Sequence, residues 1–333
     1  MNIMNFRQAR VDFDNDETYN VLVNKEILLR DKIRKLNGIK YEIYFITSNN
    51  HYINLNKETK ERVTLVSETE LSLIPNSPSV IILLNSNIGY IGPSEYINFY
   101  NTHTSVLVIT HDLDNHHWTE MSSLCCMYSD IYVPAHNTYY PWYDFLNENT
   151  LTGIPGGALR YPTEIIRANE RCVAQGRALG PVGIHFEYPQ FPYRNYIVKV
   201  LGETYPGVRL RQRESMTPDS FEEQLGQWTK FKTHWIAPVG GDLPTRLFDA
   251  LCTGGIPIIP VTLDSHLRNL GVPHDDYCVY KAFDIDNPEK ILLEAEKKFS
   301  KKDPYLRALE NSKKYSYDAF LNKILHQIEI KIG

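Results

Sequence analysis

The 333-residue sequence has few cysteines and no long apolar run. Its five cysteines are an odd number and none forms a C-x-x-C pair, which argues against both a disulfide scaffold and a zinc site. A reducing, cytoplasmic location is therefore expected. Because no apolar stretch approaches the length of a membrane span and the first residues are too polar for a signal peptide, we also expect a soluble protein.

The sequence also lacks an excess of basic residues and several well-known ligand motifs. Its formal net charge of −5 at pH 7 argues against a general nucleic-acid binder. There is no G-x-x-x-x-G-K-[ST] motif, no G-x-G-x-x-G after the first predicted strand, and no G-x-S-x-G. These absences disfavour a P-loop nucleotide site, an ordinary nicotinamide-dinucleotide site and a nucleophile elbow.

Short apolar runs alternate with helical or polar connectors along the whole chain. Several runs are nearly continuous in Val, Ile and Leu, as strands buried on both faces are, so the pattern predicts parallel α/β sheets. The predicted strands are Tyr19–Val23, Tyr41–Thr47, Val63–Val66, Val80–Asn85, Ser105–Thr110, Asp130–Pro134, Val182–Phe186, Val208–Leu210, His234–Ala237, Ile256–Pro260 and Tyr277–Tyr280. The predicted helices are Pro93–Asn101, Trp118–Tyr128, Tyr193–Tyr205, Asp219–Phe231, and two that begin near Pro288 and Pro304.

Glycine and proline concentrate between Leu151 and Leu179, where the chain reads T-G-I-P-G-G-A-L-R-Y-P. Such a segment is typical of a domain boundary. We expect two Rossmann-like domains, residues 1–165 and 166–333, which face a central cleft. Because ligands of open α/β sheets bind outside the carboxyl ends of the strands, the polar loops that follow strands carry the candidate site residues.

A dense polar cluster follows the predicted strand Ser105–Thr110 and reads H-D-L-D-N-H-H-W from His111 to Trp118. One interpretation is a general base, a histidine oriented by an aspartate, that deprotonates an acceptor hydroxyl. A second is a metal site, and a third is a turn and helix cap built on Asp114. The catalytic candidates of this loop are Asp112, Asp114, His116 and His117, and His111 is a candidate acceptor contact.

A second polar loop, A-H-N-T-Y-Y-P-W-Y, follows the strand Asp130–Pro134. Its His136, Asn137 and Trp142 are suited to line a sugar-binding wall through stacking and hydrogen bonds. A packed aromatic loop is the alternative interpretation. We keep these three residues as candidate acceptor contacts.

In the second half, the strand Val182–Phe186 leads into E-Y-P-Q-F-P-Y-R-N-Y. Arg194 and Asn195 open the next helix, where a phosphate or a ribose can be held. Glu187 is either a catalytic carboxylate that faces the cleft or a partner in a surface salt bridge. His185, inside the strand, is interpreted as a core histidine with satisfied hydrogen bonds.

The most informative stretch, Gly240 to Pro260, reads G-G-D-L-P-T-R-L-F-D-A-L-C-T-G-G-I-P-I-I-P. It predicts a polar loop, a short helix, a Gly-Gly break and a buried strand. Thr245 and Arg246 fall at the helix N-terminus, where backbone N–H groups and a guanidinium can meet one anion. Asp249 is a candidate ligand contact and Asp242 a second candidate catalytic carboxylate. The alternative for Arg246 is an interdomain salt bridge.

This stretch resembles the donor-binding motif of GT-B glycosyltransferases, and it is most similar to exostosin-like and fucosyltransferase-like enzymes. The matching residues are Arg246, the helix Leu247 to Leu251, and Gly254 to Ile258. The resemblance implies that Arg246 contacts the donor phosphate and Asp249 the sugar or ribose. It also implies a last helix that crosses back to the first domain. The E-x7-E spacing of many retaining enzymes is absent, since Gly241 stands eight residues before Asp249.

The resemblance implies a cytoplasmic glycosyltransferase that moves a sugar from a nucleotide-activated donor to a glycan or lipid-linked saccharide acceptor. It is compatible with surface-polysaccharide synthesis at the inner face of a bacterial membrane. Neither a cofactor nor a divalent metal is expected. Two alternatives stay open: a metal-dependent hydrolase that uses the cluster between His111 and His117, and a non-catalytic carbohydrate-binding protein with the same fold.

Overall fold

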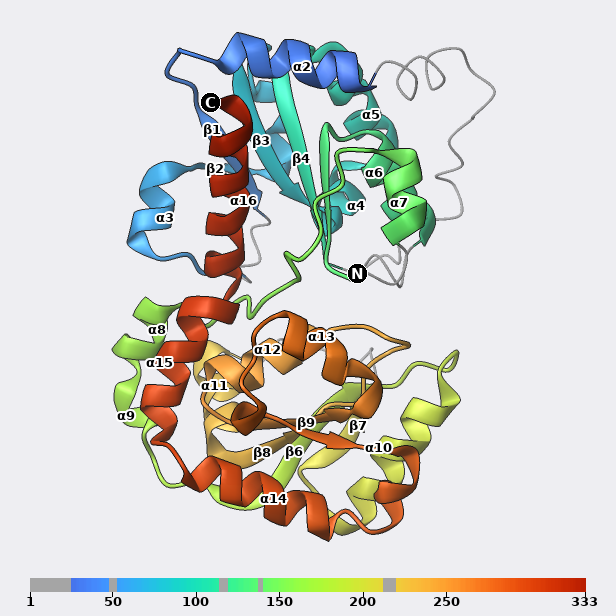
Figure 1. Cartoon of the computed structure of the whole chain (residues 1–333), viewed down its shortest axis with the longest axis vertical. Helices are drawn as coiled ribbons and strands as arrows, with labels where there is room; N and C mark the ends of the chain where they lie inside the picture. The colour runs from blue at the N-terminus through green and yellow to red at the C-terminus, as the bar shows by residue number, and fades with distance from the viewer. Residues whose placement is uncertain (1–24, 48–52, 114–118, 137–139, 212–219) are drawn as a thin grey trace. The chain divides into compact units, whose positions relative to one another are not determined.

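Figure 1 shows a computed structural model of the chain, which describes residues 25–47, 53–113, 119–136, 140–211 and 220–333. The chain divides into two compact units, Met1–Gly156 with Leu321–Gly333, and Gly157–Phe320. Each unit is built on a five-stranded sheet in which all the paired strands are parallel. The two predicted Rossmann-like α/β architectures are therefore present. The predicted strand Tyr19–Val23 lies outside the described residues.

Unit 1 has the strand order β2-β1-β3-β4-β5. All six residues of β3 and all seven of β4 are buried, which requires helices on both faces of the sheet (Figure 1). The strands are β1 Ile43–Thr47, β2 Thr64–Ser67, β3 Ser79–Leu84, β4 Val106–Asp112 and β5 Ile131–Pro134. The helices are α2 Lys25–Leu36, α3 Lys57–Arg62, η2 Glu68–Leu73, α4 Asn85–Ile91, α5 Pro93–Thr102, α6 Thr119–Met127, α7 Tyr140–Leu146 and, from Leu321 onward, α16 Tyr317–Ile332.

Unit 2 has the strand order β10-β9-β8-β6-β7. The strands are β6 Ala178–Phe186, β7 Val208–Arg211, β8 Phe231–Trp235, β9 Ile256–Pro260 and β10 Cys278–Tyr280. The helices are α8 Thr163–Ala168, α9 Glu170–Val173, α10 Pro192–Thr204, α11 Phe221–Lys230, α12 Thr245–Cys252, α13 Asp264–Asn269, α14 Glu289–Ser300 and α15 Pro304–Tyr315, with the short turns η5 Val261–Leu263, η6 His274–Asp276 and η7 Ala282–Asp286.

Both sheets have the same strand order when each is numbered from its own first strand: second, first, third, fourth, fifth. In such a doubly wound sheet the chain changes direction between the first and third strands, and ligands bind outside the carboxyl ends of the strands at that point. The switch point is β1/β3 in unit 1 and β6/β8 in unit 2.

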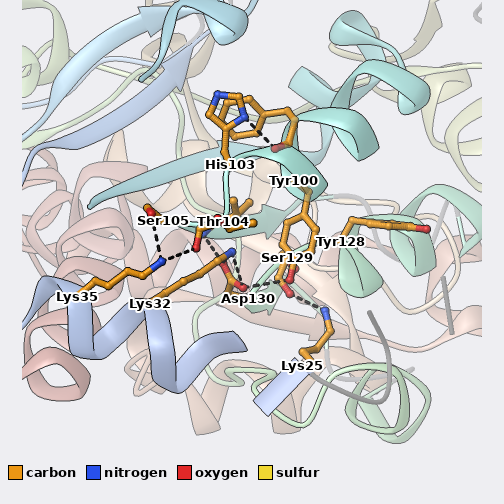
Figure 2. Close-up of polar contacts among 12 residues, drawn as sticks. Lys25, Lys32, Lys35, Tyr100, His103, Thr104, Ser105, Tyr128, Ser129 and Asp130 are labelled. Carbon is orange, nitrogen blue, oxygen red and sulfur yellow. Dashed lines mark hydrogen bonds and ion pairs between the residues drawn. The ribbon is translucent and has the colours of Figure 1, made fainter. Parts of the chain in front are cut away.

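A buried ion pair holds α2 against the amino end of β5 in unit 1 (Figure 2). Lys32 Nζ lies 2.7 Å from Asp130 Oδ2, and Tyr100 donates a hydrogen bond to Oδ1 of the same carboxylate at 3.0 Å. The backbone N–H of Val108 adds a third bond at 2.7 Å. Nearby, Lys25 Nζ donates to the carbonyl of Ser129 at 2.7 Å. These contacts lie at the edge opposite to the carboxyl ends of the strands, so they stabilise the unit and do not belong to the candidate site.

The joint between α12 and β9 depends on two glycines. Gly254 has φ 79°, and a Cβ there would collide with the backbone carbonyl oxygen of Pro304 in α15. A Cβ on Gly255 would collide with the ring of His234 in β8. The helix buries its apolar stripe against the sheet, while Asn311 and Ser312 of α15 donate to its last carbonyl oxygens. The sequence therefore fixes both where α12 ends and how it reaches β9.

Candidate functional site

Two helices of unit 2 begin close to the β6/β8 switch point and bring an arginine each to it. β6 ends at Phe186 and β8 at Trp235. Arg194 stands in the first turn of α10, which opens with Pro192, and Arg246 stands in the first turn of α12. Both were predicted donor-binding residues, and the structure brings them to one place.

Arg194 is buried across the ends of both strands. Its Nε donates to the carbonyl oxygen of Ala237, just after β8, at 2.8 Å. Its Nη1 donates to the carbonyl oxygen of Phe186 at 2.5 Å, and its Nη2 lies 3.3 Å from Nδ1 of His185. The guanidinium therefore spans the gap between the two strands, and the residue as a whole is only 4% exposed.

Arg246 reaches the same strand from the other helix. Its Nη1 donates to the carbonyl oxygen of Ile184 and lies 2.8 Å from Nδ1 of His185. Within the part of the chain that the structure describes, Nε and Nη2 of Arg246 make no hydrogen bond. The residue is part-buried at the carboxyl ends of the strands, and these two donors are not committed to any described residue.

Neither arginine forms an ion pair with a carboxylate among the described residues. Asp242 and Asp249 are near enough to act on Arg246 electrostatically, and each favours its charged form. Burial, followed by the charge of Arg194, lowers the pKa of Arg246 to about 10, and burial lowers that of Arg194 as well. Both groups stay cationic at neutral pH. Two cations held together in a partly desolvated place favour an anion beside them.

Asp249 follows Arg246 by three positions on α12 and shares its face of the helix. Burial raises the pKa of Asp249 to about 7, although Arg246 and Arg160 oppose the shift. The carboxyl group is therefore partly protonated at neutral pH. In that state it can both donate and accept a hydrogen bond, which suits a contact with a hydroxyl group.

Three of the other predicted donor-side residues, Asn195, Glu187 and Asp242, already form hydrogen bonds or an ion pair within unit 2. Asn195 closes the loop before α10, because its Oδ1 accepts from the N–H of Tyr188 at 3.3 Å and its Nδ2 donates to the same residue's carbonyl at 2.9 Å. Glu187 pairs with Lys199 at 3.2 Å, with both side chains partly exposed. Asp242 Oδ1 accepts from the N–H of Val239 at 2.7 Å and so shapes the loop before α12. Thr245 is the first residue of α12.

In unit 1, β4 extends two residues beyond the predicted strand and takes in His111 and Asp112. Both side chains are fully buried. Asp112 Oδ2 accepts a hydrogen bond from the hydroxyl of Tyr132 at 2.7 Å. Burial lowers the pKa of His111 to about 4, although a hydrogen bond to the backbone of Ile154 opposes the shift, so the imidazole is neutral at physiological pH. The predicted Asp114, His116 and His117 lie outside the described residues.

The predicted sugar-binding wall is described in part. His136 is buried immediately after β5, whereas Trp142 on α7 is 47% exposed. The indole N–H of Trp142 donates to Ser123 at 3.0 Å, and its ring stacks on Phe145 with centroids 5.9 Å apart. Asn137 lies outside the described residues.

One residue of the site was not assigned to it from the sequence. His185 was interpreted as a core histidine, and it is indeed buried, but both arginines contact its Nδ1. Its position near the carboxyl end of β6 was the available signal. The contact itself depends on which helices begin beside the strand, and the sequence does not show that.

Among the described residues, no three His, Cys, Asp or Glu side chains gather in a way that could hold a metal ion. None of the described helices combines the length and the apolar character needed to cross a membrane.

No protein-family model matches the chain, and no curated protein matches it. Among solved structures, the chain is similar to UDP-GlcNAc 2-epimerase from Neisseria meningitidis bound to UDP-GlcNAc, with 10% identity over 88% of this chain and 100% of that one and a TM-score of 0.40. At values this low, the α/β assignment rests on the strand order of the chain's own two sheets.

Proposed function

We propose that unit 2 binds the phosphate groups of a nucleotide-activated sugar at the β6/β8 switch point, and that the protein is a glycosyltransferase. One observation carries the proposal: Arg194 and Arg246 meet at the switch point of a doubly wound sheet, and neither has a carboxylate ion-pair partner among the described residues. A ligand with one or more phosphates supplies the missing negative charge, and helix N-termini beside it add backbone donors.

The same pair supplies the chemistry that sugar transfer needs on the donor side. When the bond to the sugar breaks, negative charge develops on the leaving phosphate, and fixed cations near that phosphate stabilise the transition state. The proposal needs neither a cofactor nor a metal for this step. Thr245 and Asn195 belong to the proposed donor site, and Asp249 contacts a sugar or ribose hydroxyl.

The acceptor half of the proposal concerns unit 1. The acceptor is a glycan or a lipid-linked saccharide, and a base removes the proton of its hydroxyl. The candidates for that base are Asp112, Asp114, His116 and His117, with Glu187 and Asp242 as second choices on the donor side. His111, His136, Asn137 and Trp142 are the proposed acceptor contacts. A lipid-linked acceptor would bring the enzyme to the cytoplasmic face of a membrane.

A thermal-shift panel with UDP, GDP, CMP and their sugar conjugates tests the proposal. Because a ligand that binds only the folded state raises the melting temperature, at least one member of the panel should stabilise the protein. Arg246→Ala should lose this stabilisation. Arg268→Ala is the matched control, since Arg268 is an exposed arginine of unit 2 that pairs with Asp264 at 2.9 Å. A protein that responds to no nucleotide, or an Arg246→Ala variant that responds like the control, would rule the proposal out.

A further inference from the structure

The hydrogen bonds of His185 define which of its ring nitrogens carries the proton. Nε2 lies 3.1 Å from the carbonyl oxygen of Trp235. A carbonyl oxygen only accepts hydrogen bonds, so Nε2 must be the donor and carry the proton. Nδ1 faces two guanidinium groups, which only donate, so Nδ1 must be the unprotonated acceptor. The neighbours on both sides therefore select the same neutral tautomer.

Burial reinforces that neutral state. Burial and the charges of Arg246 and Arg194 hold the pKa of His185 well below its ordinary value. Protonation would put a third positive charge between the two guanidinium groups and remove the lone pair that accepts from them. His185 can therefore act as a fixed acceptor over the pH range in which proteins are normally studied.

Both guanidinium groups have independent anchors on the same strand. Arg246 donates to the carbonyl oxygen of Ile184, and Arg194 to that of Phe186. His185 stands between these two residues on β6 and supplies one nitrogen to both cations. Like charges repel, so acceptors must offset the repulsion between two guanidinium groups that lie close together.

We propose that His185 is a positioning residue whose unprotonated Nδ1 holds the guanidinium groups of Arg194 and Arg246 together, so that they bind one anion jointly. The proposal rests on the proposed function only in taking that anion to be the phosphate part of a nucleotide-sugar. Joint binding of a smaller anion by the arginine pair does not depend on the nucleotide.

Two substitutions of His185 separate acceptance of hydrogen bonds from mere filling of space. His185→Asn places an amide oxygen where Nδ1 stands, so it keeps an acceptor for the arginines. His185→Leu keeps a buried side chain but offers no acceptor. We expect Leu to weaken the binding of inorganic pyrophosphate about 10- to 100-fold, and Asn to weaken it less than about 3-fold.

Isothermal titration with inorganic pyrophosphate, at fixed ionic strength, measures these affinities in the full-length chain. Arg194→Ala and Arg246→Ala are combined in a double-mutant cycle, in the His185 background and in the His185→Leu background. The two arginines should be coupled in the first background and nearly additive in the second. A uniform loss of affinity in the His185→Leu background would leave the coupling between the two arginines unchanged. Equal pyrophosphate affinity in His185→Leu and the parent protein would overturn the proposal.

A measurement on the unsubstituted protein covers the case in which His185→Leu does not fold. The ¹⁵N chemical shifts of the imidazole should identify Nε2 as protonated and Nδ1 as unprotonated. A proton on Nδ1 would overturn the proposal, because an N–H group cannot accept from the arginines.

The outcomes for the two proposals differ. If pyrophosphate binds through the coupled arginines but no nucleotide or nucleotide-sugar does, the positioning role stands and the glycosyltransferase proposal fails. If nucleotides bind and His185→Leu binds them as tightly as the parent, the positioning role fails and the glycosyltransferase proposal stands. If neither pyrophosphate nor any nucleotide binds, both proposals fail.

Discussion

At the level of single residues, Arg194 and Arg246 illustrate what could be foreseen. A basic residue at the start of a helix is visible in a sequence, and both arginines were predicted as donor-site residues for that reason. Their shared contact with His185 was not predicted, because it depends on the adjacency of β6 and β8. Local sequence therefore identified the charged groups, and tertiary structure supplied what joins them.

Asp249 gives a prediction about stability and pH. Its pKa is 3.8 in an ordinary setting and about 7 in the fold, so between these values the folded state holds a proton that the unfolded state has released. The free energy of unfolding must then fall as pH rises through this window, by at most about 1.4 kcal/mol per pH unit. Asp249→Asn removes this dependence, so the variant should gain stability relative to the parent from pH 4 to pH 7. Urea denaturation at several pH values measures the free energy of unfolding of both proteins. If the two free energies changed with pH in parallel, the account would be contradicted.

Lys32 gives a second residue-scale prediction, at the buried ion pair of unit 1 (Figure 2). Lys32→Met leaves the carboxylate of Asp130 buried without its cation, which should lower the free energy of unfolding by about 3–5 kcal/mol. Lys35→Met is the matched control on the same helix, because Lys35 is exposed and, among the described residues, hydrogen-bonds only to the backbone of Thr104 and the hydroxyl of Ser105. The control should change stability by less than about 0.5 kcal/mol. Similar losses in both variants, measured by urea denaturation, would mean that α2 is simply sensitive to substitution.

At the level of elements, the ends of a strand or helix were predicted correctly where glycine or proline marks them in the sequence. β9 was predicted from Ile256 to Pro260, as observed, because a Gly-Gly break precedes it and proline ends it. In contrast, α2 (Lys25–Leu36) was not predicted. Its apolar residues are few among many charges, and its place in the fold depends on the buried contacts of Lys25 and Lys32. β4 was predicted to end at Thr110, because polar residues follow, but Tyr132 accommodates Asp112 inside the sheet.

The joint between α12 and β9 gives an element-scale prediction. Gly254→Ala forces a non-glycine residue into positive φ and also drives its Cβ against the backbone of α15. The two effects together should lower the free energy of unfolding by about 3 kcal/mol or more. Gly271→Ala is the control, since Gly271 also has positive φ (72°) but a Cβ there would meet nothing within 4 Å. In that variant the free energy of unfolding should fall by only about 1–2 kcal/mol, which is the part due to the unfavourable backbone conformation.

The difference between these glycine variants, measured by urea denaturation, isolates the packing of α12 against α15. Because α12 carries Arg246, the same displacement should weaken pyrophosphate binding in Gly254→Ala and leave it unchanged in Gly271→Ala. Equal stability losses in the two variants would contradict the close approach of the two helices.

At the level of the whole molecule, the chain builds one strand order twice, but only unit 2 pairs arginines at the switch point among the described residues. In unit 1, the neutral His111 and the hydrogen-bonded Asp112 stand at the end of β4, the strand that pairs with β3. A phosphorylated ligand should therefore bind unit 2. The repetition of the α/β pattern was readable from the alternating apolar runs, whereas this difference in charge was not, because it depends on which side chains meet at each edge.

Amide hydrogen exchange tests that assignment. Addition of the nucleotide that stabilises the protein should slow exchange in the first turns of α10 and α12 and at the ends of β6 and β8. Exchange in β1 and β3 should stay unchanged. Protection confined to unit 1 would mean that the phosphate site lies in unit 1, which would contradict the assignment.

The most direct test of the central claim is isothermal titration of that nucleotide into the parent protein, Arg194→Ala, Arg246→Ala and the control Arg268→Ala. Each of the first two variants loses charged hydrogen-bond donors at the β6/β8 edge, so each should bind about 10- to 100-fold more weakly. Arg268→Ala should bind like the parent. Undiminished binding by both Arg194→Ala and Arg246→Ala would contradict the claim that these two arginines form the phosphate site.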